Sequence, residues 1–278
     1  MRRLVASLVV GLGILLSFAR WADAQWVPTG GPGCGTITDL VVCGPNLFAS
    51  TLGGGVFMST NNGTSWTAVN SGLSESWIWC LAVSGENLFA GTESHGVFLS
   101  KNNGASWTKV NSGLTGFDVL CLAVSGKNLF AGTNNEGVFL SPDNGESWTA
   151  VNSGLPTTIF VECLAVSGKS LFAGTWQGVF LSSDKGENWT AVNSGLPEDT
   201  HVNCLAVSGT NLFAGSNNGV FLSKNEGESW TAVNSGLHSE SSIDCLAVSG
   251  KNIFAGTNGA GVFLSTNNGE SWTPQTPA

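Results

Sequence analysis

Residues 141–148 read Ser-Pro-Asp-Asn-Gly-Glu-Ser-Trp, and a closely similar eight-residue box occurs six times in the chain. The boxes occupy residues 59–66, 100–107, 141–148, 182–189, 223–230 and 265–272. Their tryptophans are Trp66, Trp107, Trp148, Trp189, Trp230 and Trp272, with spacings of 41, 41, 41, 41 and 42 residues. A constant period of this length indicates a repeat protein in which each copy is one supersecondary unit.

The unit around the third box, residues 118–155, has the pattern of an antiparallel meander. Strand-like segments at 118–124, 128–131, 138–141 and 147–152 are separated by turns rich in glycine, asparagine and serine. No segment of the chain has a sustained helical period. The unit is therefore expected to be a small four-stranded sheet.

Each expected sheet carries apolar residues on both faces, as Leu129, Phe130 and Val138 show in the third unit. Stacking the units face to face covers these residues, and closing the stack into a ring leaves no exposed end. The sequence therefore predicts an all-β fold, a six-bladed β-propeller of four-stranded antiparallel blades with about 41 residues per blade. The expected blades are residues 36–73, 77–114, 118–155, 160–196, 201–237 and 242–278.

Residues 1–24 are typical of a signal peptide. Arg2 and Arg3 precede an apolar stretch at 4–19, and the small residues of 22–24 suit cleavage. The apolar stretch is short for a membrane span, and a retained membrane anchor is the alternative. We expect a single propeller domain at residues 25–278 that is secreted or periplasmic, without stable membrane insertion once the signal is removed.

Residues 25–29 resemble an additional fourth strand. Trp26 precedes Leu40 by 14 residues, much as Trp66 precedes Leu81 by 15. This segment could add to the blade made by residues 242–278 and clasp the two ends of the propeller together, although that blade has a fourth strand of its own.

The charge of the chain excludes several classes of partner. All three arginines, Arg2, Arg3 and Arg20, lie in the signal segment, and the chain has no tyrosine. Without residues 1–24 the chain keeps 7 lysines and 18 of its 19 acidic residues, since Asp23 is removed, and its net charge is −11. Nucleic acid and anionic membrane surfaces both require basic surface, so we expect neither as a partner.

The cysteines are expected to be free thiols. Cys80, Cys121, Cys163, Cys204 and Cys245 occupy the same position in five successive units, each followed by Leu-Ala-Val. Equivalent positions in neighbouring units are held apart by the repeat, and a small apolar residue packs well there. A strand is expected between Cys34 and Cys43, and its length places the two cysteines too far apart for a disulfide.

The box itself is explained by local turn geometry. Its third residue is an Asn or Asp that can accept backbone hydrogen bonds across a tight turn, its glycine permits a positive φ, and its tryptophan is expected to pack into the blade. The third residues are Asn61, Asn102, Asp143, Asp184, Asn225 and Asn267. Because four copies hold Asn, Asp143 and Asp184 are interpreted as structural residues rather than a catalytic pair.

The pattern Ser-x-Asp/Asn-x-Gly-x-Ser/Thr-Trp resembles the Asp-box, or bacterial neuraminidase repeat, and the resemblance covers residues 36–278. Asn188 departs from it, where Ser or Thr is usual. The resemblance implies a propeller similar to those of sialidases, other glycoside hydrolases, sortilin-type receptors and photosystem II stability/assembly factors. In that family the box is a structural hairpin remote from the functional site, so the resemblance implies the fold and not the activity.

The sialidase activity of that family is not expected here. Sialidases hold the substrate carboxylate with three arginines and attack with a tyrosine, and residues 25–278 contain neither residue type. Lysine cannot replace arginine, since it lacks the bidentate fork. The arginine-rich patch of the photosystem II assembly factors is missing as well.

Candidate binding residues lie at the end of the units where the sequence varies. The first-to-second strand turns and the boxes are nearly identical between units, whereas the fourth-to-first connections and second-to-third loops differ, and specificity usually resides in variable loops on a rigid scaffold. The candidates are Trp77, Trp79, Phe117, Asp118, Phe160, Glu162, Trp176, His201, Asn203 and Asp244. The alternative interpretation is that the aromatic residues fill space between blades and that Glu162, Asn203 and Asp244 are solvated rim residues.

We therefore expect an exported, non-catalytic propeller that binds a protein or a carbohydrate, or serves as a scaffold, through the variable end. The alternative is a glycoside hydrolase that uses two carboxylates among Asp118, Glu162 and Asp244. A purely structural envelope protein is the third possibility. His95, His201 and His238 show neither metal-ligand spacing nor a nucleophile–base arrangement, so no metal, cofactor or catalytic residue is assigned.

Overall fold

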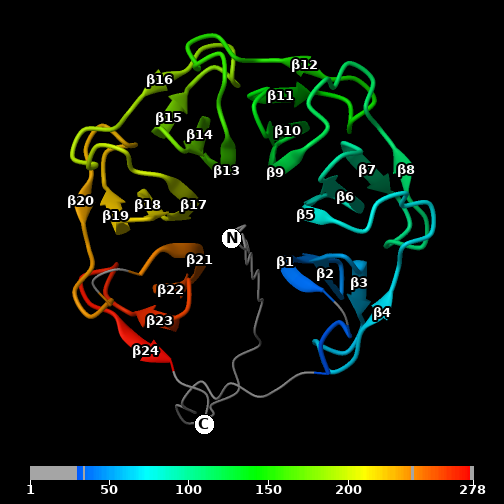
Figure 1. Cartoon of the computed structure of the whole chain (residues 1–278), viewed down its shortest axis with the longest axis horizontal. Coiled ribbons are helices and arrows are strands. Elements are labelled where there is room, and N and C mark those ends of the chain that lie inside the picture. The colour runs from blue at the N-terminus through cyan, green and yellow to red at the C-terminus, as the bar shows by residue number, and fades with distance from the viewer. Residues whose placement is uncertain (1–29, 34, 239–240, 276–278) are drawn as a thin grey trace.

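A computed structural model describes residues 30–33, 35–238 and 241–275. The predicted signal peptide, the strand-like segment 25–29 and Cys34 lie outside these ranges. The described chain forms six four-stranded sheets, each antiparallel and ordered as in the sequence, arranged around a common axis (Figure 1). The predicted six-bladed β-propeller is confirmed.

In each blade the innermost strand is followed directly along the chain by the second strand. The innermost strands are β1 (Thr36–Cys43), β5 (Ile78–Ser84), β9 (Val119–Ser125), β13 (Val161–Ser167), β17 (Val202–Ser208) and β21 (Ile243–Ser249). The second strands are β2 (Asn46–Leu52), β6 (Asn87–Thr92), β10 (Asn128–Thr133), β14 (Ser170–Thr175), β18 (Asn211–Ser216) and β22 (Asn252–Thr257). Figure 1 shows the innermost strands nearest the common axis of the six blades.

The outer two strands are shorter. The third strands are β3 (Gly55–Ser59), β7 (Val97–Ser100), β11 (Val138–Ser141), β15 (Gly178–Ser182), β19 (Gly219–Ser223) and β23 (Gly261–Ser265). The outermost strands are β4 (Thr67–Ala68), β8 (Thr108–Lys109), β12 (Thr149–Ala150), β16 (Thr190–Ala191), β20 (Thr231–Ala232) and β24 (Thr273–Gln275). The expected fourth strand at 147–152 is thus limited to two residues, because Trp148 N donates instead to Ser112 O of the preceding blade, at 2.8 Å.

The box folds as a self-contained turn. In the third blade, Asp143 Oδ1 accepts hydrogen bonds from Ser141 Oγ at 2.7 Å and from Ser147 N at 2.9 Å. Gly145 N donates to Ser141 Oγ, and Gly145 has a φ of +86°. Hydrogen bonds from Ser147 and Ser141 lower the pKa of the Asp143 carboxyl, so the carboxylate is committed to the turn.

The box tryptophan joins two blades, whereas the sequence suggested that it packs within one. Trp148 Nε1 donates to Val110 O of the preceding blade at 2.8 Å, and the ring packs in a buried cluster with Phe89 and Val97 of blade 2 and Phe139 of blade 3. Trp107, Trp189, Trp230 and Trp272 make the same bond to Val69, Val151, Val192 and Val233. Five equivalent interfaces therefore link the six blades in sequence.

The junction between blade 6 and blade 1, here named the 6–1 junction, departs from the expected closed ring. Trp66 is half-buried, and within the described ranges its Nε1 has no hydrogen-bond partner. On the blade 6 side, Phe254 and Val262 are half-buried, whereas their counterparts in the other five blades are at most 1% exposed. Figure 1 shows a wider interval between β21–β24 and β1–β4 than between other neighbouring blades. Among the described residues, no sixth apolar cluster closes this junction.

The prediction of free thiols is confirmed for the six cysteines that the structure describes: Cys43, Cys80, Cys121, Cys163, Cys204 and Cys245. The repeated cysteine faces the next blade, where Cys121 Sγ donates to Val161 O at 3.4 Å. Burial raises the pKa of each repeated thiol, so these side chains are poor nucleophiles. Cys245 is the exception in exposure, because the side of blade 6 on which it lies is not covered by a further blade.

In the folded protein, iodoacetamide is expected to alkylate Cys245 faster than Cys204. Cys204 is 3% exposed beneath blade 6, while Cys245 is half-buried at the 6–1 junction. Burial raises the pKa of both thiols, and that of Cys204 well above its usual value, so lower access and lower thiolate content both slow the reaction of Cys204. Timed labelling followed by peptide mass mapping measures the order, with urea-unfolded protein as the control in which both react alike. Equal protection of the two thiols would mean that the junction is closed.

Candidate binding face

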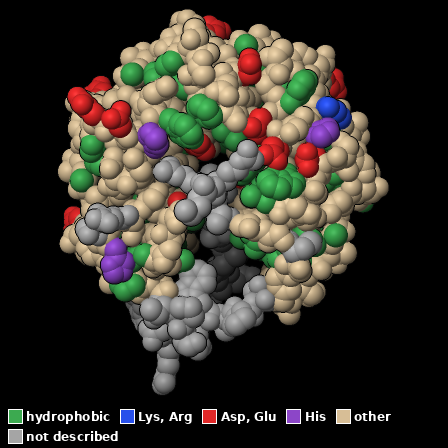
Figure 2. All heavy atoms as spheres, in the orientation of Figure 1, with side chains coloured by type: hydrophobic (Ala, Val, Ile, Leu, Met, Phe, Trp, Pro, Cys, Tyr) green, Lys and Arg blue, Asp and Glu red, His purple; other side chains and the backbone are tan. Residues whose placement is uncertain are grey.

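Two kinds of loop share one end of the propeller, and their sequences differ between blades. The fourth-to-first connections, such as residues 110–118, lie at the same end as the second-to-third loops, such as residues 134–137. We name this end the variable face. Figure 2 views the variable face, which carries all three histidines of the chain.

Three large apolar side chains are exposed among the described residues, and all lie on the variable face. Trp77 is 39% exposed, Phe117 44% and Trp176 41%. Two other candidates, Trp79 and Asn203, are buried. Trp79 is only 9% exposed, and Asn203 is 3% exposed because its Nδ2 donates to Ile243 O of the next blade at 2.9 Å.

The loop that carries Trp77 is held by an acidic residue. Glu75 Oε1 accepts hydrogen bonds from Ser76 N at 2.8 Å and Trp77 N at 3.0 Å, and Glu75 Oε2 lies 3.1 Å from His95 Nδ1. Burial acts to raise the pKa of Glu75, but these hydrogen bonds outweigh it and the pKa is lowered. Trp77 is therefore presented on a loop fixed by an ionised carboxylate.

An aromatic stack spans blades 4 and 5 of the variable face. Trp176 lies between Phe160, with ring centroids 4.2 Å apart and planes 10° apart, and His201, with centroids 5.3 Å apart and planes 4° apart. Trp176 Nε1 donates to Glu162 Oε1 at 2.6 Å. The structure thus brings together four of the predicted site residues. Trp176 remains 41% exposed within this stack.

The remaining carboxylates among the candidates lie on separate blades. Asp118 Oδ2 accepts a hydrogen bond from Asn134 Nδ2 at 2.7 Å, which ties the connection before β9 to the β10–β11 loop. Asp244 lies in β21 and is half-buried. Within the described ranges, no group of three or more His, Cys, Asp or Glu side chains could hold a metal ion.

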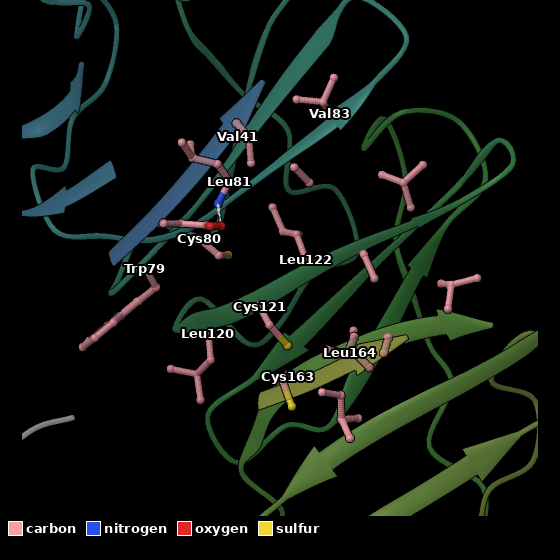
Figure 3. Close-up of a pocket in the computed structure, with 18 of the residues that line it drawn as sticks. Val41, Trp79, Cys80, Leu81, Val83, Leu120, Cys121, Leu122, Cys163 and Leu164 are labelled. Atoms are coloured by element: carbon pink, nitrogen blue, oxygen red, sulfur yellow. Dashed lines mark hydrogen bonds between the residues drawn. The ribbon is translucent and has the colours of Figure 1, made fainter. Parts of the chain in front are cut away.

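A cavity of about 770 Å³ occupies the central channel. Its walls are mainly apolar because the Leu-Ala-Val segments of β5, β9, β13, β17 and β21, and Leu-Val-Val in β1, turn alternate side chains toward the axis. The lining includes the leucines Leu81, Leu122, Leu164, Leu205 and Leu246 and the valines Val42, Val83, Val124, Val166, Val207 and Val248. Figure 3 shows Trp79, Leu122 and Leu164 on strands around this cavity.

Two polar features of the cavity differ from its apolar walls. Trp79 Nε1 is buried and has no hydrogen-bond partner in the part of the chain that the structure describes, and Glu162 also lines the cavity. Asp39 takes the place of the repeated cysteine in the first blade, where its Oδ2 accepts a hydrogen bond from Leu81 N at 2.9 Å, drawn as the dashed line in Figure 3. The role of Asp39 was missed, although its position in the first repeat is a visible signal.

Charge is distributed unequally between the two ends of the propeller. Six of the lysines lie in the box turns or first-to-second strand turns, at the end opposite the variable face: Lys101, Lys127, Lys169, Lys185, Lys224 and Lys251. The variable face carries eight described carboxylates that are at least partly exposed: Glu75, Glu93, Asp118, Glu136, Glu162, Glu198, Asp199 and Asp244. Among the described lysines only Lys109 of β8 reaches toward it, with its Nζ 5.4 Å from the centroid of Phe117. Figure 2 shows this predominance of acidic side chains.

Comparisons with solved structures show the same fold in proteins of different kinds. A GH74 xyloglucanase from Xanthomonas campestris is 17% identical with a TM-score of 0.72, over 91% of this chain and 46% of that chain. The extracellular domain of a B. thetaiotaomicron protein is 16% identical with a TM-score of 0.75, over 91% of this chain and 35% of that chain. The chain thus spans less than half the length of these two proteins. At these identities the likeness concerns the fold alone.

A protein of similar length is YCF48 from Cyanidioschyzon merolae, which is 13% identical with a TM-score of 0.68, over 91% of this chain and 88% of that chain. A structure of YCF48 bound to D1 peptide is 17% identical with a TM-score of 0.70, over 93% and 85% of the two chains. No curated protein matches this sequence significantly. No helix in the described ranges is long and apolar enough to span a membrane.

A family model matches the whole of the repeat region in two overlapping segments, residues 35–170 and 164–278. The model describes a β-propeller domain, in agreement with the six four-stranded sheets. The chain belongs to the family of the DUF6242 β-propeller domain.

Proposed function

We propose that the protein is an exported, non-catalytic module that binds a protein or glycan partner through its variable face. The exposure of Trp77, Phe117 and Trp176 supports this function, since these are the three large apolar side chains that the described surface leaves open, and all lie at one end. Aromatic side chains held on rigid loops supply contact area at low entropic cost. The apolar box tryptophans of the second to sixth blades, by contrast, are buried between blades.

The relatives in fold support a binding role without specifying the ligand. One of the similar solved structures is YCF48 bound to D1 peptide, and another is an extracellular domain. GH74 enzymes share the fold, but their chains are more than twice the length matched here. For hydrolysis, two carboxylates must be free at a suitable separation. Glu162 already accepts a hydrogen bond from Trp176, and Asp118 accepts one from Asn134.

The test is a binding screen with purified protein against a peptide library and a glycan array, run beside a polysaccharide hydrolysis assay. A Trp77→Ala/Phe117→Ala variant is expected to lose at least ~10-fold in affinity for any ligand found, as truncation of central aromatic anchors usually does. The matched control is Lys224→Ala/Glu228→Ala, which alters the opposite end without changing net charge and should bind normally.

Two results would contradict the proposed function. Ligand binding that is unchanged in the Trp77→Ala/Phe117→Ala variant would place the site elsewhere. Polysaccharide hydrolysis that is abolished by Asp118→Asn or Asp244→Asn in a folded protein would show an enzyme.

A further inference from the structure

The negative charge of the variable face indicates which chemical class of partner it favours. Eight partly exposed carboxylates lie there with one described lysine, Lys109, while the other six lysines lie at the opposite end. A field of one sign concentrates ligands of the opposite sign and repels ligands of its own. A neutral glycan would gain nothing from this field, whereas a cationic protein segment would.

The aromatic side chains of the face are placed beside acidic groups. Trp176 is hydrogen-bonded to Glu162, and Trp77 follows the Glu75 carboxylate that holds its loop. Phe117 already receives a cation, since Lys109 Nζ lies over its ring. A ring next to a carboxylate attracts Lys and Arg through the ring face and the negative charge together.

The stack at Trp176 argues against a sugar as the main ligand. A sugar ring stacks on the open face of an aromatic side chain. Phe160 and His201 both stack on the Trp176 ring, so less of its face is open for a sugar ring.

An unsatisfied donor provides an independent sign of a ligand. Trp79 is 9% exposed, it lines the central cavity, and its Nε1 has no hydrogen-bond partner among the described residues. A buried donor without a partner is costly, and it is commonly satisfied when a ligand supplies an acceptor. A peptide backbone carbonyl is such an acceptor and adds no negative charge to the acidic face.

We propose that the variable face binds a basic peptide segment of a partner protein, with Lys or Arg side chains on the carboxylate–aromatic pairs and a backbone carbonyl at Trp79 Nε1. This inference rests on the proposed binding function and specifies its ligand class. It implies an extended segment rich in lysine or arginine rather than an acidic or neutral one.

The experiment measures fluorescence anisotropy of a labelled nine-residue peptide that alternates glycine with lysine and arginine. Peptides with glutamate or glutamine at the same positions serve as comparisons. The basic peptide is expected to bind at least ~10-fold more tightly than either, and to weaken at least ~10-fold between about 50 mM and about 500 mM NaCl. The Trp79→Phe variant, checked for folding by near-ultraviolet circular dichroism, is expected to bind the basic peptide several-fold more weakly.

A matched pair of triple variants separates local recognition from net charge. Glu136→Gln/Glu198→Gln/Asp199→Asn neutralises exposed carboxylates of the variable face, and Glu146→Gln/Glu187→Gln/Glu228→Gln neutralises three exposed carboxylates of the opposite end. We expect a loss of about 10-fold in affinity for the basic peptide in the first variant and little change in the second.

Equal losses in the two triple variants, or binding that salt does not weaken, would overturn the inference. Selective binding of a neutral glycan by the same face would overturn it too, yet would leave the proposed binding function in place. If no peptide and no glycan bound, both the inference of a basic peptide ligand and the proposed binding function would be contradicted.

Discussion

Phe172→Ala is expected to lower the free energy of unfolding by about 3–5 kcal/mol, the usual cost of removing a fully buried phenylalanine. Phe172 has no exposed surface and packs from blade 4 against Val202 and Trp230 of blade 5. The cavity left behind is bounded by sheets joined through the Trp230 Nε1 to Val192 O hydrogen bond, so it should not collapse easily. Urea denaturation monitored by tryptophan fluorescence measures the change.

Phe254→Ala is the matched control for this substitution. Phe254 occupies the same position in blade 6, but it is half-buried at the 6–1 junction. Its removal takes less apolar surface away from a packed environment, and a loss of only about 1–2 kcal/mol is expected. If the two variants lose equal stability, the blade 6 residue is as well packed as its counterparts and the junction is closed.

Gly154→Ala is expected to cost about 3–4 kcal/mol of stability, because it combines an unfavourable backbone conformation with a backbone clash. Gly154 has a φ of +90°, and a Cβ placed there would lie 2.1 Å from Trp189 O. Trp189 N also donates to the neighbouring Ser153 O at 2.8 Å, so the connection cannot move away without breaking an interblade hydrogen bond.

Gly259→Ala provides the control at the same φ of +90°, in a position where an added Cβ meets no atom within 4 Å. Its cost should be limited to that of a non-glycine residue at positive φ, about 1–2 kcal/mol. Thermal and urea unfolding of the two variants would separate the conformational cost from the clash. A Gly154→Ala variant no less stable than Gly259→Ala would show that the connection between blades 3 and 4 is adaptable.

Much of the fold was predictable because its signals are local. The Gly145 turn, the third-position Asp143 and the two-residue connection before Asn128 all act within a few residues, and they recur with the period of the boxes. Local turn chemistry and strand alternation therefore sufficed to predict the number of blades and the number of strands in each.

The candidate site was predicted less well, because exposure depends on neighbouring blades. Trp79 and Asn203 occupy the position just before the repeated cysteine, as Glu162 does, yet the first two are buried and Glu162 is half-buried. Asn203 is buried through Ser242 and Ile243, about 40 residues further along the chain. Similarly, nothing in the spacing of Phe160, Trp176 and His201 indicates that their rings stack.

The repeat pattern of the chain predicts a β-propeller of six four-stranded blades, free cysteines at the described positions and a set of variable loops at one end. It could do so because turns, strand periodicity and the repeat length are properties of single units. The tertiary structure alone decided that the box tryptophans join neighbouring blades, that the 6–1 junction differs from the other five, and that the variable face combines exposed aromatic residues with acidic charge. These features arise where side chains from different blades meet, and such contacts depend on how the blades are placed around the axis.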